Sequence, residues 1–378
     1  MRIILVDDEP LALAYLEKLL VEIGGLTIIG SYTNPNQAIQ SVIQHKPDLI
    51  FLDINLPDIN GIDFAEQVQS ILPEVHIVFI TAYDEYAVKA FELNAIDYVM
   101  KPVQRDRLNR TINRITDRKT VEPLRSQTDS KIISCFQTLH FQKGSEIGKA
   151  EPIDVNWRTA KARELFAYLV QHRKQPVRKD VLLEFFWPES DVKKGYAQLY
   201  SAIYQIRKML DSLQMNSTVV SFDKSYKLHL NGTKLDVEEW ERELRQLPNI
   251  TEDTLPSYRR LLETYKGDYL AEEAYLWAEN ERERLRTLYH STFNKVTTYY
   301  LECGYYTDAI TLCQRVQTLH PLMETSYFLL MQVYAKMGDN HSVKSQYEKL
   351  NHVLEAEYGI HTSDSIENWY NEWKKQLQ

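Results

Sequence analysis

Cysteine and long apolar runs are both scarce in this chain of 378 residues. Its three cysteines, Cys135, Cys303 and Cys313, form neither a CxxC pair nor a disulfide framework, so we expect reduced thiols that serve packing. No apolar run approaches the roughly 20 residues that cross a bilayer. Acidic residues follow residue 6 at once, which leaves no room for a signal-peptide core. We therefore expect a cytoplasmic protein without membrane contact.

Positive charge is also in deficit, with a formal net charge of −9. This balance argues against a protein that coats nucleic acid without specificity. The deficit is uneven, however. Residues 1–120 hold 11 Lys/Arg and 17 Asp/Glu (net −6), residues 156–230 hold 13 and 7 (net +6), and residues 231–378 carry a net −8. One basic module between two acidic ones is typical of a localised phosphate-binding surface.

Residues 1–118 alternate between strand-like and helix-like patterns. Apolar runs typical of strands occupy residues 3–6, 27–31, 49–52, 75–81 and 98–100, with helical spacing between them. This alternation predicts an α/β domain with a doubly wound, five-stranded parallel sheet. Residues 119–131 are polar and aperiodic, so we interpret them as a linker.

Charged or hydroxyl-bearing residues stand at the ends of four of these five strands. Asp7 and Asp8 end the first strand, Asp53 the third, Thr81 the fourth and Lys101 the fifth. Ligands bind at the carboxyl ends of strands in open parallel sheets. Two like charges about 4 Å apart cost roughly 4 kcal/mol at an effective dielectric of 20, so Lys101 or Mg²⁺ must compensate. A single acid at a strand end is more often a solvated loop residue, but the combination favours phosphoryl transfer to the Asp53 carboxylate.

Four segments make residues 1–118 resemble the receiver domain of two-component response regulators. They are Leu-Val-Asp-Asp-Glu-Pro (5–10), Leu-Asp-Ile-Asn-Leu-Pro (52–57) with Asn60-Gly61, Thr-Ala-Tyr (81–83) and Asp-Tyr-Val-Met-Lys-Pro (97–102). The resemblance implies that Asp53 accepts a phosphoryl group from a sensor histidine kinase. It assigns Mg²⁺ to Asp7, Asp8, Asp53 and the Asn55 carbonyl, the phosphoryl contacts to Thr81 and Lys101, and the switch aromatic to Tyr98. It also implies a cis peptide before Pro102. Residues 82–98 look like receivers that precede a LytTR DNA-binding domain, which the downstream sequence does not match.

Residues 132–232 show the pattern of a winged helix-turn-helix, an α+β fold. Short strand-like runs precede helical segments at 160–172, 178–187 and 193–213, and a hairpin of residues 219–222 and 226–230 follows. Leu199, Ile203, Ile206 and Leu210 form the apolar stripe of the third helix. Our candidate DNA-binding residues lie on its polar side and in the hairpin turn: Lys193, Lys194, Gln198, Ser201, Tyr204, Gln205, Lys208 and Lys224. For a basic helix taken alone, a solvated surface is the commoner explanation.

Residues 233–378 read as nearly all helix and contain a repeat of 34 residues. Tyr300 and Tyr334, Gly304 and Gly338, and Leu319 and Val353 are the matching positions, at the spacing of tetratricopeptide-like repeats. Residues 131–378 resemble the Streptomyces antibiotic regulatory protein family in the stretches 160–169, 197–210 and 265–288. This resemblance implies an OmpR-type winged helix, with residues 193–208 as its recognition helix, joined to a bacterial transcriptional activator domain.

These patterns together predict a multidomain transcription factor in which phosphorylation of Asp53 controls binding to double-stranded DNA. RNA polymerase is a further candidate partner. We also expect phosphorylation to promote a homodimer through the fourth helix, fifth strand and fifth helix, with Val88, Lys89, Phe91, Asp97, Tyr98, Arg107, Arg110 and Arg114 on that face. The alternative is a phosphoswitched scaffold that binds proteins through its helical repeats. An enzyme acting on a separate substrate is disfavoured, because the sequence contains neither a glycine-rich phosphate loop nor a His–Asp or Cys–His constellation.

Overall fold

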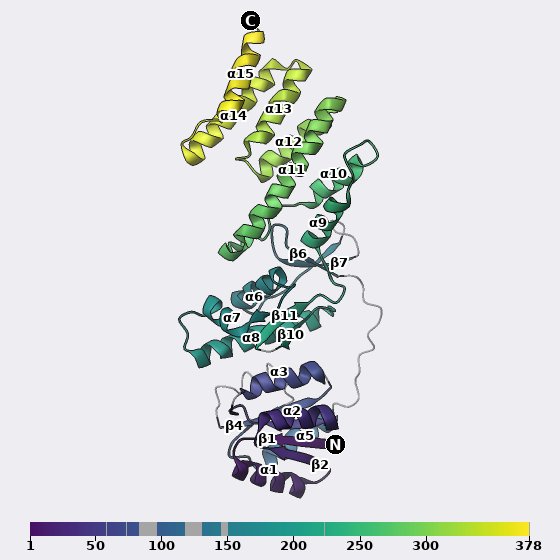
Figure 1. Ribbon diagram of the computed structural model, residues 1–378, viewed down its shortest axis with the longest axis vertical. Helices are drawn as coiled ribbons and strands as arrows, with labels where there is room; N and C mark the ends of the chain where they lie inside the picture. Colours follow the sequence, from purple (N-terminus) through teal and green to yellow (C-terminus); the bar gives the residue numbers. More distant parts are fainter. Residues whose placement is uncertain are drawn as a thin grey trace. The chain divides into compact units, whose positions relative to one another are not determined.

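The computed structural model describes residues 1–57, 59–72, 74–82, 97–117, 131–144, 150–222 and 224–377 (Figure 1). The expected linker therefore lies outside the described residues except at Lys131, and so does the expected fourth helix of the receiver. The chain divides into two units, one made of residues 1–130 and 154–233 and the other of residues 131–153 and 234–378. Among the described residues, no helix is both long and apolar enough to span a bilayer.

The first unit begins with the predicted parallel sheet, in the strand order β2-β1-β3-β4-β5. Its elements are β1 (Arg2–Val6), α1 (Pro10–Ile23), β2 (Thr27–Tyr32), α2 (Pro35–His45), β3 (Leu49–Leu52), α3 (Gly61–Ile71), β4 (His76–Thr81), β5 (Asp97–Met100) and α5 (Arg105–Asp117). All neighbouring strands pair in parallel, which confirms the doubly wound sheet. Apolar side chains of α1 and α5 pack on one face of the sheet. Helices α2 and α3 contact each other. The strands are continuous apolar runs because helices cover them.

The same unit contains the predicted three helices and hairpin. The elements are α6 (Ala160–Gln171), β9 (Val177–Arg178), α7 (Lys179–Phe186), α8 (Val192–Ser212), β10 (Thr218–Phe222) and β11 (Ser225–His229), with an antiparallel sheet in the order β10-β11-β9. Leu199, Ile203 and Ile206 of α8 are fully buried and Leu210 is nearly so, which confirms the apolar stripe. The stripe anchors α8 and leaves its polar side turned away from this core.

The second unit opens with a small sheet that closes onto the C-terminal helices. The strands are β6 (Lys131–Ser134), β7 (His140–Lys143), β8 (Glu151–Ile153) and β12 (Lys234–Leu235), in the order β12-β6-β7-β8. Strand β6 pairs with β12, and the buried Asp236 carboxylate accepts backbone N–H groups of Cys135 and Phe136. These contacts bind residues 131–153 to the helical unit. The structural division therefore falls at residue 154, whereas the sequence pattern placed the start of the winged-helix domain at residue 132.

Helices fill the rest of the second unit and confirm the repeat. They are α9 (Asp236–Gln246), α10 (Leu255–Thr264), the 3₁₀ turns η2 (Ala271–Glu273) and η3 (Leu276–Ala278), α11 (Glu279–Cys303), α12 (Tyr306–Leu319), α13 (Glu324–Met337), α14 (Asn340–Tyr358) and α15 (Asp364–Gln376). Gly304 ends α11 and Gly338 ends α13, each in the left-handed conformation with φ of 79° and 76°. Both helices are followed directly by a partner helix, which Figure 1 shows in green to yellow. The spacing of 34 residues is therefore one helix pair.

Candidate functional site

The carboxyl ends of β1, β3 and β5 bring Asp7, Asp53 and Lys101 together, as the sequence predicted. The Lys101 Nζ lies 2.8 Å from Asp7 Oδ2 and 2.9 Å from Asp53 Oδ2. Glu9, which the sequence analysis did not single out, follows at 3.8 Å. Both aspartates are buried, at 4% and 6% exposure. The lysine ammonium therefore supplies a counter-charge that the two carboxylates need at this distance.

The turn after β3 fixes the position of Asp53. Its Oδ1 accepts the backbone N–H of Ile54 at 2.6 Å, and the N–H of Asn55 lies 3.4 Å away. Gly61, at the start of α3, packs directly behind this turn. A Cβ at that position would lie 2.1 Å from the Asp53 carbonyl oxygen, so only glycine allows the approach. The backbone N–H of Gly61 also donates to the Ile54 carbonyl at 2.7 Å.

Burial and hydrogen bonding act in opposite directions on the charges of this site. Burial raises the pKa of Asp7, although the Lys101 hydrogen bond and the N–H of Glu9 favour its ionised form. Burial alone would lower the pKa of Lys101, but its hydrogen bonds to Asp7 and Asp53 outweigh this effect and raise it. Lys101 is therefore a permanent cation at neutral pH.

The carboxylates also meet the requirements of a hard divalent cation. One oxygen each of Asp7, Asp8 and Asp53 lies within 4.8 Å of the others, with Asp8 exposed to solvent. Such a set of oxygen donors, open on one side to water, suits Mg²⁺. The Asn55 carbonyl, the fourth expected ligand, belongs to the loop that follows Asp53 and bridges to Asn60. The donor chemistry thus fits the ion that the resemblance implied.

Thr81 ends β4 at the same carboxyl edge of the sheet. Its hydroxyl is fully buried, and no partner for it occurs in the described part of the chain. A buried polar atom without a partner is unfavourable and often marks a position that serves a ligand. Tyr98 lies on β5 opposite Phe79, but its side chain is outside the described residues. The peptide bond between Lys101 and Pro102 is cis, as expected.

The candidate DNA-binding residues gather on one side of α8 and at the hairpin turn. Lys194 and Lys208 are exposed, and the Lys208 ammonium lies 5.9 Å from the centre of the Tyr204 ring. Gln198 accepts a hydrogen bond from Ser190 Oγ, and Gln205 accepts one from Thr159 and donates one to Ser201. Lys224 is exposed in the turn, with φ of 58°. The side chain of Lys193 lies outside the described residues.

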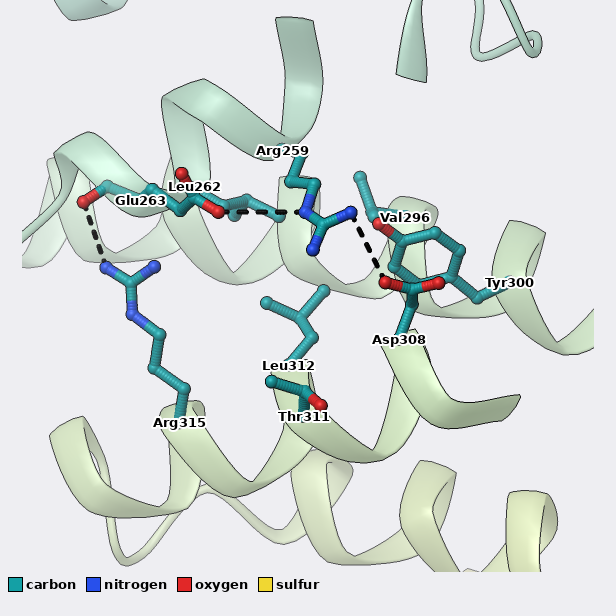
Figure 2. A pocket seen from close by; sticks show the side chains of 9 residues that line it. All are labelled: Arg259, Leu262, Glu263, Val296, Tyr300, Asp308, Thr311, Leu312 and Arg315. Carbon is teal, nitrogen blue, oxygen red and sulfur yellow. Dashed lines mark hydrogen bonds and ion pairs between the residues drawn. The ribbon is translucent and has the colours of Figure 1, made fainter. Parts of the chain in front are cut away.

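The second unit contains a small pocket between α10, α11 and α12 (Figure 2). Its lining residues are Arg259, Leu262, Glu263, Val296, Tyr300, Asp308, Thr311, Leu312 and Arg315. Figure 2 shows Arg259 between two carboxylates, with 3.6 Å to Glu263 and 3.3 Å to Asp308. Arg315 donates to the Glu263 carbonyl at 3.0 Å. The pocket measures about 70 Å³, room for only a few water molecules.

The parallel sheet and the aspartate–lysine cluster at its carboxyl edge define a receiver-type α/β domain. Two family models agree with this class and extend it. Residues 3–113 match the response regulator receiver domain, and residues 235–373 match the bacterial transcriptional activator domain. The chain therefore contains one segment similar to receiver domains and a second segment similar to bacterial transcriptional activator domains.

Curated relatives share about 115 residues with this chain. The sensory transduction protein LytR of Staphylococcus haemolyticus is 44% identical over 115 residues, which are 30% of this chain and 45% of that protein. An uncharacterized response regulatory protein of Vibrio cholerae is 44% identical over 113 residues, 30% of this chain and 47% of that protein. The response regulatory domain of mrkE from Klebsiella pneumoniae is a similar solved structure, with 38% identity, a TM-score of 0.30, and coverage of 31% of this chain and 96% of that domain. The chain spans about half the length of these curated relatives.

Proposed function

We propose that this protein is a two-component transcriptional regulator in which a sensor histidine kinase phosphorylates Asp53 and thereby controls DNA binding. The observation that carries the proposal is the Lys101 ammonium between the buried carboxylates of Asp7 and Asp53. Beside it stands a buried Thr81 hydroxyl without a partner among the described residues. A carboxylate nucleophile, a fixed cation and a spare donor are the groups that phosphoryl transfer to an aspartate requires.

Asp53, Lys101 and Thr81 each have a separate role in the phosphoryl transfer. A carboxylate oxygen of Asp53 forms the new bond to phosphorus, while the bond from phosphorus to the donor's histidine nitrogen breaks and that nitrogen keeps the electron pair. Mg²⁺ held by Asp7, Asp8, Asp53 and the Asn55 carbonyl would neutralise charge on the transferred group. Lys101 then exchanges part of its contact with Asp53 for a phosphoryl oxygen. The Thr81 hydroxyl donates to a second oxygen.

The output of this switch is sequence-specific binding to double-stranded DNA through α8 and the β10–β11 turn. Lys194 and Lys208 reach phosphates, and Ser201, Tyr204 and Gln205 face base edges in the major groove. The local charge of +6 over residues 156–230 supports this assignment in a chain with a net charge of −9. We place Lys193, Gln198 and Lys224 in the same interface.

We propose four functional regions along the chain. Residues 1–118 form the receiver, 119–131 the linker, 132–232 the winged-helix domain and 233–378 the activator domain, with strands β6–β8 of the winged-helix segment packed in the helical unit. The activator domain is the surface through which we expect contact with RNA polymerase. Two receivers pair after phosphorylation, so that two winged helices reach adjacent half-sites.

Selection of bound duplexes from a random pool tests the DNA-binding function. The protein, treated with acetyl phosphate and Mg²⁺, should enrich a defined sequence, and its affinity should fall steeply with salt. A protein that enriches no sequence and shows no salt-dependent binding would instead support the scaffold alternative, in which the helical repeats bind a protein partner.

A further inference from the structure

Helix α3 contributes a buried acidic side chain to a polar cluster outside the phosphoacceptor site. The Glu66 side chain has no exposed surface. Its carboxylate accepts from the Lys179 ammonium at 2.9 Å, from Arg207 Nη1 at 3.1 Å and from the Tyr226 hydroxyl at 2.9 Å. Four charged or polar groups therefore meet where the α3 surface contacts α7, α8 and β11, all within the first unit.

Asp63 extends the cluster from one helical turn earlier. Residues three apart lie on the same face of a helix. The Asp63 Oδ1 accepts from Lys179 at 2.5 Å and from the Tyr200 hydroxyl at 2.7 Å. Lys179 thus contacts both acids, and only 2% of its side chain is exposed.

Two of the four donors belong to the candidate recognition helix α8, and the other two lie on α7 and β11, next to the hairpin turn that holds Lys224. Tyr200 precedes Ser201 on α8, and Arg207 precedes Lys208. The backbone N–H of Lys179 donates to the carbonyl of Lys224 at 2.8 Å, in the hairpin turn. The donors therefore lie between the recognition helix and the wing. Winged-helix proteins place these two elements against the DNA backbone and grooves.

The carboxylates of Asp63 and Glu66 can accept the same hydrogen bonds from these donors as a phosphate group can. A carboxylate and a phosphate diester both present anionic oxygens that accept hydrogen bonds from Lys, Arg and hydroxyl groups. A buried cation without a partner is strongly unfavourable, so the donors need an anion as long as α3 covers them. Burial would raise the pKa of Glu66, but Lys179 and Arg207 outweigh it and hold this pKa below its usual range. Glu66 is therefore ionised at neutral pH.

We propose that Lys179, Tyr200, Arg207 and Tyr226 form a binding site for a backbone phosphate of DNA, and that Asp63 and Glu66 occupy this site in the absence of DNA. The proposal rests on the DNA-binding function and assigns it a further site. The contact of these donors with α3 and their contact with DNA exclude each other. The receiver thereby competes with DNA through two carboxylates that imitate a phosphate.

Two variants of α3 and a matched control test this competition. Glu66→Gln removes the buried charge, and Asp63→Asn removes a partly exposed one with less risk to folding. Glu22→Gln is the control, because it removes the same charge from the exposed α1, where Glu22 lies 3.9 Å from Arg105. The unphosphorylated variants are titrated against a fluorescein-labelled 30-base-pair duplex of mixed sequence, by fluorescence anisotropy at several salt concentrations. Thermal unfolding confirms that each variant is folded.

We expect both α3 variants to bind the duplex about tenfold more tightly than wild type, within the usual range of coupling between sites. Glu22→Gln should bind no more than about twofold more tightly. Adding Lys179→Gln to the Glu66→Gln variant should remove the gain and lower the slope of log K against log salt by about 0.9. If wild type binds and the folded α3 variants match Glu22→Gln, the phosphate-site proposal is overturned while DNA binding stands. If neither wild type nor any variant binds, the DNA-binding function fails and this proposal fails with it.

Discussion

Lys101 determines the resting state of the acidic pocket, because one ammonium contacts both buried aspartates. The sequence located this pocket well. Asp7, Asp53, Thr81 and Lys101 each follow an apolar strand, and the carboxyl ends of parallel strands meet at one edge of the sheet. The sequence could not reveal that Thr81 is buried with no partner in the described part of the chain, or that Glu9 lies near Lys101. Those facts depend on side-chain packing, which leaves no periodic signal in the chain.

At this scale we predict that Asp53→Asn abolishes phosphoryl incorporation. Asparagine has nearly the same shape but lacks the nucleophilic carboxylate, so transfer from acetyl phosphate with Mg²⁺ should stop. Intact-mass measurement after incubation with the donor reads the added phosphoryl group directly. Circular dichroism checks that the variant is folded. A folded variant that gains the group as wild type does would show that another residue is the acceptor.

At the scale of the elements, α8 combines a buried stripe with an exposed basic side. We predict that Lys194→Ala and Lys208→Ala each weaken DNA binding, because each lysine contacts a phosphate. Each loss should reduce the slope of log K against log salt by about 0.9. The free energy of unfolding should change by less than about 0.5 kcal/mol, since both side chains are exposed. Unchanged affinity and slope in both variants would mean that α8 is not the recognition helix.

The α3 cluster predicts a characteristic pH dependence of stability. The folded pKa of Glu66 lies below its unfolded value, so its contribution is complete above the unfolded value and is lost as pH falls through the folded one. Removing one partner of a buried ion pair costs about 3 kcal/mol or more. The difference in unfolding free energy between wild type and Glu66→Gln should therefore be largest near neutral pH and shrink in acid.

Urea denaturation at several pH values measures this difference. Lys179, Arg207 and Tyr226 face Glu66 in both proteins, and Asp63 lies one helical turn away in both, so the comparison isolates the Glu66 carboxyl group. A difference that stays constant down to the acid-unfolding limit would contradict a charged Glu66 in the folded protein.

The sequence predicted these elements better than their contacts. Apolar spacing located α6, α7 and α8 to within one residue at each end, because buried faces impose a period on the chain. Asp63 and Glu66, by contrast, have the spacing of an ordinary solvated helix face. Their partners Lys179 and Arg207 lie more than a hundred residues away, so no local pattern indicated that the four would meet.

At the scale of the whole molecule, we predict that phosphorylation promotes self-association. The expected face includes Arg107 and Arg110 of α5, while Val88, Lys89 and Phe91 lie outside the described residues. A two-fold contact needs both positive and negative charges on the same face, and the arginines of α5 supply the positive ones. Sedimentation velocity with and without beryllofluoride and Mg²⁺ should show a larger species only with the phosphoryl mimic. A monomer in both conditions, or an equally strong dimer in both, would contradict this mechanism.

Strands β6–β8 belong to a different structural unit from the helices that follow them in the chain. The strands β6–β8 precede the winged-helix segment in the chain, so their order suggested that they belong to it. Their pairing with β12 and the Asp236 hydrogen bonds place them with the helical unit. Such long-range pairing depends on residues about a hundred positions apart, which a pass along the sequence does not connect.

The most direct test of the central claim is the affinity for DNA in the two states of Asp53. The duplex selected from the random pool is titrated by fluorescence anisotropy with protein alone and with protein plus beryllofluoride and Mg²⁺, for wild type and for Asp53→Asn. We expect the mimic to tighten binding by wild type about 5- to 150-fold, the usual range of coupling between two sites, and to leave Asp53→Asn unchanged. Equal affinities of wild type with and without the mimic would contradict a DNA-binding switch at Asp53.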